Sequence, residues 1–180
     1  MRLIKEMSPQ LLARIAGGIY VLVFVAGVFS LFVRSGIGVA AASIAGALYI
    51  AVTVLFYFIF KPVNRGISLL AAIISLLGII IGPLTFVIRS LSVISPLVFF
   101  GFYCLLIGYL IFKSGFLPHI LGALMLFAGF GWLTFLWASL ANTLSPYNFL
   151  PGIIGEGALT LWLLIMGVNE QAWKEQASHR

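Results

Sequence analysis

Six long apolar segments, separated by short polar ones, constrain this chain more than any other feature of its sequence. An α-helix of about 20 residues rises ~30 Å, which matches the hydrocarbon core of a bilayer. Each segment is expected to be a membrane-spanning helix, because a backbone in lipid has to satisfy its own hydrogen bonds. The predicted spans lie at about 11–33, 39–60, 67–88, 96–112, 120–141 and 149–168.

The composition agrees with a protein that is solvated by lipid. Hydrophobic residues make up 63% of the chain and charged residues only 8%, which leaves too little polar surface for a water-soluble domain. We therefore predict an all-α membrane protein, a bundle of six transmembrane helices in which residues 1–180 form a single domain. Membrane lipids are its expected surroundings.

The basic residues stand singly between the apolar segments and predict the orientation of the chain. Six spans place both termini on one side, and only Arg34 and Arg89 fall on the other side. Because cytoplasmic loops carry the excess of positive charge, we expect both termini in the cytoplasm. The net charge is +6, but nucleic acid is not an expected partner, because its recognition needs basic residues clustered on one face. The basic residues on the side of the termini are Arg2, Lys5, Arg14, Lys61, Arg65, Lys113, Lys174 and Arg180.

One acidic residue, Glu156, lies inside an apolar segment. It comes seven residues after Phe149, so in a helix it would sit roughly 10 Å below the outer membrane surface. A carboxyl group at this depth usually faces the bundle interior or a water-filled cavity, and it often marks a functional site. Gly152 and Thr160 share its helical face, and such a face suits a helix contact or a small cavity.

Two interpretations of Glu156 stay open at this point. In the structural one, it accepts hydrogen bonds from Tyr, Ser, Thr or Trp of another helix, or pairs with Arg34 or Arg89, and so locks the bundle. In the functional one, it holds a ligand, carries a proton or takes part in catalysis. An ion pair is geometrically possible, because the predicted orientation puts both arginines on the same side as Glu156 and a nearby cation favours the charged carboxylate.

Polar and aromatic side chains in the other segments are further candidates for contact with a ligand. Tyr49, Thr53 and Tyr57 recur at helical spacing on one face of the second segment, where they either bond another helix or line a ligand site. Trp132 lies near the centre of the fifth segment, away from the interfaces where Trp concentrates, so its indole N–H needs a partner. Tyr103 in the fourth segment belongs to the same candidate set.

Small residues at helical spacing predict closely packed helix faces. Ala13 and Gly17 form such a pair in the first segment. The third segment carries a longer stripe, which consists of Ser68, Ala71, Ser75, Gly78 and Gly82.

The common catalytic and cofactor signatures are missing from the sequence. A single cysteine, Cys104, excludes an intramolecular disulfide and a cysteine metal site, and it is interpreted as a small buried hydrophobe. Two histidines are too few for a histidine metal cluster or for a haem held by two histidines from within the bundle. No catalytic residue, cofactor or metal is assigned, and an enzymatic activity is left open.

Short motifs near the helix ends resemble those of a known family. They are ARIAG at 13–17, FKPVNRG at 60–66, GFLP at 115–118 with LG at 121–122, and GE at 155–156 with LWLL at 161–164. Over roughly residues 11–168 the chain resembles the bacterial multi-pass family known as domain of unknown function 4386. The resemblance implies an uncharacterised integral membrane protein of about six spans in the bacterial cytoplasmic membrane. Members often carry charged residues in the third span, whereas this chain has Ser75 and Gly78 there.

Four functions are compatible with these features. The preferred one is a non-enzymatic bundle that binds or moves a small, partly apolar molecule through an outer cavity near Glu156. In the second, the chain is similar to the substrate-capture subunits of energy-coupling-factor transporters, and the Ala13/Gly17 face meets a partner subunit. The others are a membrane-embedded enzyme on a lipid substrate and a purely structural or regulatory bundle. The possible partners are therefore a small-molecule ligand, a second copy of the chain or transporter subunits.

Overall fold

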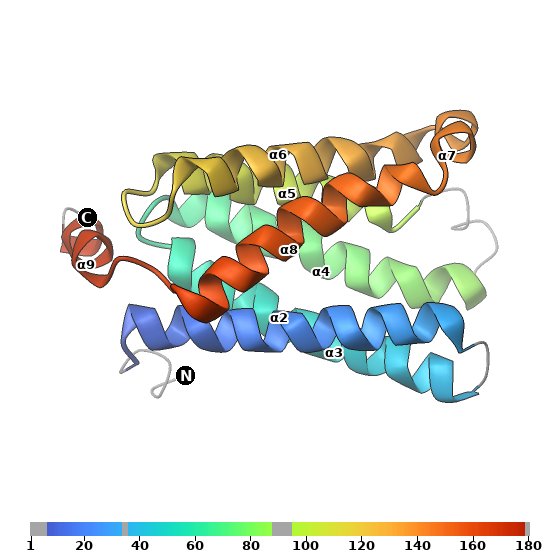
Figure 1. Cartoon of the computed structure of the whole chain (residues 1–180), viewed down its shortest axis with the longest axis horizontal. Coiled ribbons are helices and arrows are strands. Elements are labelled where there is room, and N and C mark those ends of the chain that lie inside the picture. Colours follow the sequence, from blue (N-terminus) through green and yellow to red (C-terminus); the bar gives the residue numbers. More distant parts are fainter. Residues whose placement is uncertain (1–6, 34–35, 88–94, 179–180) are drawn as a thin grey trace.

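The computed structural model describes residues 7–33, 36–87 and 95–178, and these residues form helices joined by short turns (Figure 1). Five of the helices are long and apolar enough to cross a membrane, and a further apolar helix, α5, is shorter. The all-α class is thereby confirmed, and the helices fit a multi-pass membrane protein. Together these six helices are α2 (Pro9–Phe32), α3 (Gly36–Phe60), α4 (Arg65–Val87), the shorter α5 (Leu97–Lys113), α6 (His119–Leu133) and α8 (Leu150–Ile165).

The helix in the fifth predicted segment, 120–141, ends earlier than expected. α6 stops at Leu133 and gives way to a 3-10 turn, η2 (Thr134–Leu136), and then to a short helix, α7 (Ala138–Leu144). Trp137 between them is extended, with φ −120° and ψ 110°. The Thr134 hydroxyl donates to the Gly131 carbonyl oxygen at 2.7 Å, a local bond that competes with the regular helix. A second 3-10 turn, η3 (Tyr147–Phe149), leads into α8.

Within the described residues, six helices form a closed ring. Each helix from α2 to α6 packs against the next one in the chain, and α8 packs against both α2 and α6. Figure 1 shows α8 running diagonally between these two helices. Large side chains such as Tyr20, Phe56 and Tyr103 fill the interior, while leucine, isoleucine, valine and phenylalanine cover much of the outer surface. The outer surface therefore suits contact with lipid tails.

Glycines let α8 approach its neighbours closely. A Cβ atom added at Gly17 of α2 would lie 2.5 Å from the Leu164 backbone nitrogen of α8. A Cβ atom at Gly155 would collide with the Leu124 carbonyl oxygen of α6. Both obstacles are backbone atoms, so no side-chain movement can make room for them. The close packing predicted for Gly17 is confirmed. In the third-segment stripe, Ser68, Ala71, Ser75 and Gly78 are buried, and the last member, Gly82, is half-buried.

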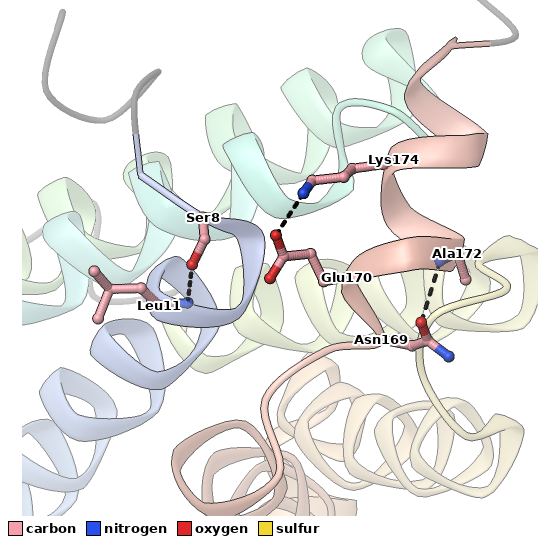
Figure 2. Close-up of polar contacts among 6 residues, drawn as sticks. All are labelled: Ser8, Leu11, Asn169, Glu170, Ala172 and Lys174. Carbon is pink, nitrogen blue, oxygen red and sulfur yellow. Dashed lines mark hydrogen bonds and ion pairs between the residues drawn. The ribbon is translucent and has the colours of Figure 1, made fainter.

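The start of α2 and the end of α8 are joined at one end of the ring. Ser8 begins α2 by accepting a hydrogen bond from the Leu11 backbone nitrogen at 3.2 Å (Figure 2). Gln10 then bridges to the turn after α8, where its amide donates to the Met166 carbonyl oxygen at 2.8 Å and accepts from the Val168 nitrogen at 3.0 Å. Gly167 has φ +70°, a conformation that side chains disfavour and that lets the chain turn here.

The last helix, α9 (Glu170–Ser178), covers this same end of the bundle (Figure 1). The Asn169 side chain accepts from the Ala172 nitrogen at the start of α9, and Lys174 pairs with Glu170 at 2.6 Å (Figure 2). The Trp173 indole N–H donates to the Ile59 carbonyl oxygen at the end of α3, at 2.8 Å. The Gln176 side-chain amide donates to the Lys113 carbonyl oxygen at the end of α5. The Asn169 backbone nitrogen, just before α9, donates to the Phe116 carbonyl oxygen in the turn that follows α5.

We expect Trp173→Ala to release α9 from the bundle, because it removes both the bond to Ile59 and a ring that packs on the core. Backbone amides of α9 should then exchange their hydrogens at least tenfold faster, since about 1.4 kcal/mol of lost local stability corresponds to a factor of ten. Hydrogen exchange followed by mass spectrometry measures this. Gln171→Ala, on an exposed side chain of the same helix, is the control. Unchanged protection of α9 in Trp173→Ala would show that the helix docks by other contacts.

Candidate functional site

Glu156 of α8 points into the ring and is enclosed there, with 6% of its surface exposed. The Tyr20 hydroxyl of α2 donates a hydrogen bond to its Oε2 atom. The Trp132 indole N–H of α6 donates to its Oε1 atom at 2.6 Å. Each carboxyl oxygen therefore has one partner, and the two partners come from the two helices that flank α8 in the ring.

Further side chains with polar atoms surround this carboxyl group. The Tyr49 hydroxyl of α3 lies 3.1 Å from that of Tyr20, and the Cys104 thiol of α5 lies beside Glu156. Tyr20 is the twelfth of 24 residues in α2, and Tyr49 is the fourteenth of 25 in α3, so the cluster lies near the middle of these helices. We refer to it as the polar centre, which consists of Tyr20, Tyr49, Tyr103, Cys104, Trp132 and Glu156.

On the tyrosine side of the polar centre, the donors and acceptors of the hydrogen bonds can exchange roles. An indole N–H only donates, so Trp132 keeps Oε1 of Glu156 as an acceptor. A tyrosine hydroxyl both donates and accepts, and either oxygen of the Tyr20–Tyr49 pair can be the donor. The chain Tyr49 to Tyr20 to Glu156 thus satisfies a carboxylate, and the reversed chain satisfies a carboxyl group that carries a proton on Oε2. Both protonation states find partners.

Aromatic rings surround the polar centre on two sides. Tyr20 stacks on Phe24 with ring centroids 5.4 Å apart, and Tyr49 meets Tyr103 edge to face at 6.2 Å. On the other side, Trp132 packs against Phe149 at 5.7 Å. The carboxyl group therefore lies between rings from α2, α3 and α5 on one side and rings from α6 and η3 on the other.

Two buried hydroxyl groups have no hydrogen-bond partner among the described residues. They belong to Tyr103 and Thr160, with 1% and 2% of their surfaces exposed. Tyr103 is part of the polar centre, and Thr160 lies one helical turn after Glu156 in α8. Buried polar atoms almost always have partners, so these two hydroxyls are exceptions.

The structure brings Tyr49, Tyr103 and Trp132 to Glu156 and assigns other contacts to two further candidates, Thr53 and Gly152. Thr53 bonds to Ser75 of α4 at 2.8 Å and to the Tyr49 carbonyl oxygen at 2.9 Å, and so links α3 to α4. Gly152 lies directly under the Trp132 indole, where a Cβ atom would collide with the ring. Gly152 therefore makes room for the ring that bonds Glu156. The predicted partner for the Trp132 N–H is confirmed.

The proposed ion pairs of Glu156 involve Arg34 and Arg89, which lie outside the described residues. In the part of the chain that the structure describes, the side chains that approach the carboxyl group are those of Tyr20, Trp132, Cys104 and Tyr49. None of these carries a positive charge. The hydrogen bonds foreseen by the structural interpretation are thus present, and they come from neutral groups.

Sequence reasoning missed Tyr20. Cys104 is buried as predicted, but its position beside Glu156 was not foreseen. A signal for Tyr20 was available, because it lies near the centre of the first apolar segment, whereas Tyr in membrane proteins concentrates at the interfaces. Cys104 offered no such signal, since a thiol in an apolar run is usually a small buried hydrophobe. The described residues contain no group of three or more His, Cys, Asp or Glu side chains that could hold a metal ion.

The ring of apolar helices and its enclosed carboxyl group define a multi-pass helical membrane protein with a polar centre. The family described as Domain of unknown function (DUF4386) matches residues 87–167, a stretch that contains α5, α6 and α8 with both Trp132 and Glu156. An uncharacterized protein of Archaeoglobus fulgidus is 30% identical over 129 residues, which is 67% of this chain and 77% of that relative. The chain belongs to the DUF4386 family. No solved structure matches it.

Proposed function

We propose that this protein binds or moves a small, partly apolar molecule at the polar centre, with Glu156 as the group that anchors it. One observation carries the proposal: an enclosed carboxyl group shares its cluster with the buried Tyr103 hydroxyl, which has no partner among the described residues, and Thr160, one turn further along α8, has a second such hydroxyl. Purely structural polar groups in a membrane bundle are expected to be satisfied. A ligand with polar atoms on an apolar frame would complete these contacts and fit between the aromatic rings.

We include six membrane spans in the proposal: the five long helices and the shorter helix α5. Its 17 residues rise about 25 Å and lie at the lower limit of what crosses a bilayer. Basic side chains gather at the end that α9 covers, among them Lys61, Arg65 and Lys113. By the positive-inside rule this end faces the cytoplasm. The protein would then lie in the cytoplasmic membrane of its cell, with both termini inside.

With this orientation the ligand reaches Glu156 from the outer side. α8 begins at the end opposite α9 (Figure 1), and Glu156 is its seventh residue, about 9 Å from the first one. The carboxyl group is closed off by packed side chains. Entry therefore requires helices to separate at the outer end, and this part of α8 contains Gly152, Gly155 and Gly157, which weaken a helix.

The packing of α2 argues against the alternative of a substrate-capture subunit. That alternative needs the Ala13/Gly17 face to be free for a partner. Ala13 is fully buried, and Gly17 lies against the Leu164 backbone of α8. The face is therefore occupied within the chain itself, and the self-contained binding bundle is the better proposal.

Binding is tested with three probes of similar size and different charge, each added to the protein in lipid nanodiscs. They are tetraphenylphosphonium, triphenylphosphine oxide and tetraphenylborate, which are a cation, a neutral molecule and an anion. We expect saturable binding of at least one probe by calorimetry, after subtraction of empty nanodiscs. Glu156→Gln, which keeps the shape of the side chain, should weaken this binding at least tenfold, because it removes the anchoring charge or proton.

Glu175→Gln is the matched control, because it makes the same change on an exposed side chain of α9. It should bind like the unaltered protein. The proposal would be overturned if none of the three probes bound saturably. It would also fail if a folded Glu156→Gln variant bound every probe as tightly as the original.

A further inference from the structure

The polar centre has one acidic group and, among the described residues, no basic group beside it. The titratable side chains that face Glu156 are Tyr20 of α2, Tyr49 of α3, and Tyr103 and Cys104 of α5. α6 contributes only Trp132, which does not titrate. An unpaired carboxylate enclosed in a membrane bundle is costly by several kcal/mol. Within the described residues no group balances this charge, whereas a proton or a cation that enters from outside would do so.

The hydrogen bonds around Glu156 accommodate both ways of balancing that charge. With a proton on Oε2, the acid donates to the Tyr20 oxygen, and Tyr20 donates onward to Tyr49. Without the proton, the same two hydroxyls turn to donate toward Glu156. Trp132 donates to Oε1 in both states. The change between states needs only the rotation of hydroxyl groups, and the carboxyl group itself keeps a partner on each oxygen in both states.

The aromatic rings show which kind of cation suits the centre. Cations bind over the faces of tyrosine, phenylalanine and tryptophan rings, and an organic cation gains in addition from contact with their apolar surface. Tyr20 and Trp132 bond the carboxyl group directly, Tyr49 packs against Tyr20, and Tyr103 packs against Tyr49. A calcium ion needs six to eight oxygen ligands, and the described residues offer one carboxyl group and a few hydroxyls. An anion would be repelled by the carboxylate.

We propose that the ligand of the polar centre is a lipophilic organic cation that exchanges with a proton on Glu156. This inference rests on the proposed function of the same site. When one monovalent cation enters, the carboxyl group loses one proton to water, and the total charge of the site stays the same. When the cation leaves, a proton returns to Oε2. The unpartnered hydroxyl of Tyr103 offers a polar contact to the bound cation or to its water.

The exchange is tested by counting protons while tetraphenylphosphonium binds to the protein in nanodiscs. In weakly buffered solution with a pH indicator, we expect one proton released for each cation bound, below the pH at which Glu156 loses its proton unaided. In the same range the apparent affinity should fall about tenfold for each unit by which the pH is lowered, because protons and the cation compete for one carboxylate. Triphenylphosphine oxide and tetraphenylborate should bind at least tenfold more weakly.

Three variants identify the group that releases the proton. Glu156→Gln should release none and should bind the cation at least tenfold more weakly at every pH. Glu156→Asp retains a carboxyl group and should still release one proton, even if its affinity falls. Glu175→Gln, which makes the same change as Glu156→Gln on an exposed side chain of α9, should release one proton as before. If Glu156→Gln does not fold, the exchange is tested by the number of protons that the unaltered protein and Glu156→Asp release for each cation bound.

The outcomes separate this inference from the proposed function. Binding of the cation without proton release would overturn the exchange, and so would proton release that persists in Glu156→Gln. Preference for the neutral probe or the anion would overturn the inference while the proposed function still stood. Failure of all three probes to bind would remove both.

Discussion

Gly155→Ala is expected to lower the free energy of unfolding by about 3 kcal/mol, at the upper end of what overpacking usually costs. The new methyl group would collide with the Leu124 carbonyl oxygen and would lie 2.8 Å from the Ala128 Cβ atom. A carbonyl oxygen within a helix cannot move aside alone. α6 and α8 would have to separate along their whole contact, which also exposes other buried side chains.

The same substitution should weaken ligand binding as well. Glu156 is the residue after Gly155, and its partner Trp132 belongs to α6. A wider gap between the two helices lengthens the bond from the Trp132 indole to Oε1 of Glu156. Reversible unfolding of the protein in mixed micelles measures the stability, and calorimetry with the three probes measures binding.

Gly157→Ala is the matched control for this prediction. It lies two residues further along α8, and a Cβ atom there would have no atom within 4 Å. Alanine also favours a helix more than glycine does, by up to about 1 kcal/mol. The control should therefore be neutral or slightly more stable. Equal losses from both substitutions would mean that the glycines are needed for the flexibility of α8, and the packing argument would be wrong.

Trp132→Ala should cost about 3 to 4 kcal/mol, the usual range for removing a large aromatic side chain from a packed position. The indole fills the space above Gly152 and packs against Phe149. Its loss also leaves Oε1 of Glu156 without its donor in a place that is closed to water. An unsatisfied buried acceptor contributes about 1 to 3 kcal/mol to such a loss.

Two further variants divide this effect into its parts. Trp137→Ala removes the same side chain from a position that is 61% exposed, and it should change the stability by less than about 1 kcal/mol. Trp132→Phe keeps most of the ring but not the N–H, so it reports the hydrogen bond to Glu156. The prediction would be contradicted if Trp132→Ala and Trp137→Ala had similar effects in the same unfolding experiment.

The membrane class and the importance of Glu156 could be predicted from the sequence, because both depend on local properties. An apolar run of bilayer length and a lone carboxyl group within it are visible without any knowledge of the neighbours. The need of the Trp132 N–H for a partner and the close packing at Gly17 followed in the same way. Each of these predictions concerned a contact that one helix requires. None of them stated which other helix provides that contact.

The partners of Glu156 could not be predicted, because the order of helices in the ring is a property of the whole fold. Tyr20 and Glu156 are 136 residues apart in the chain. Nothing in either segment indicates that α8 packs between α2 and α6. The early end of α6 was hidden for a different reason: the sequence stays apolar through Trp137, and hydropathy alone does not distinguish a helix from a 3-10 turn.

The closure of the ring by α8 has a consequence for how the protein is made. A ribosome releases α2 through α6 before α8, so the five earlier helices reach the membrane as an open arc. In that intermediate, Tyr20 and Trp132 lie on the two edges of the seam that α8 later fills, and neither has its carboxyl acceptor. The insertion of α8 therefore delivers an acidic helix into a gap lined by hydroxyl and indole donors.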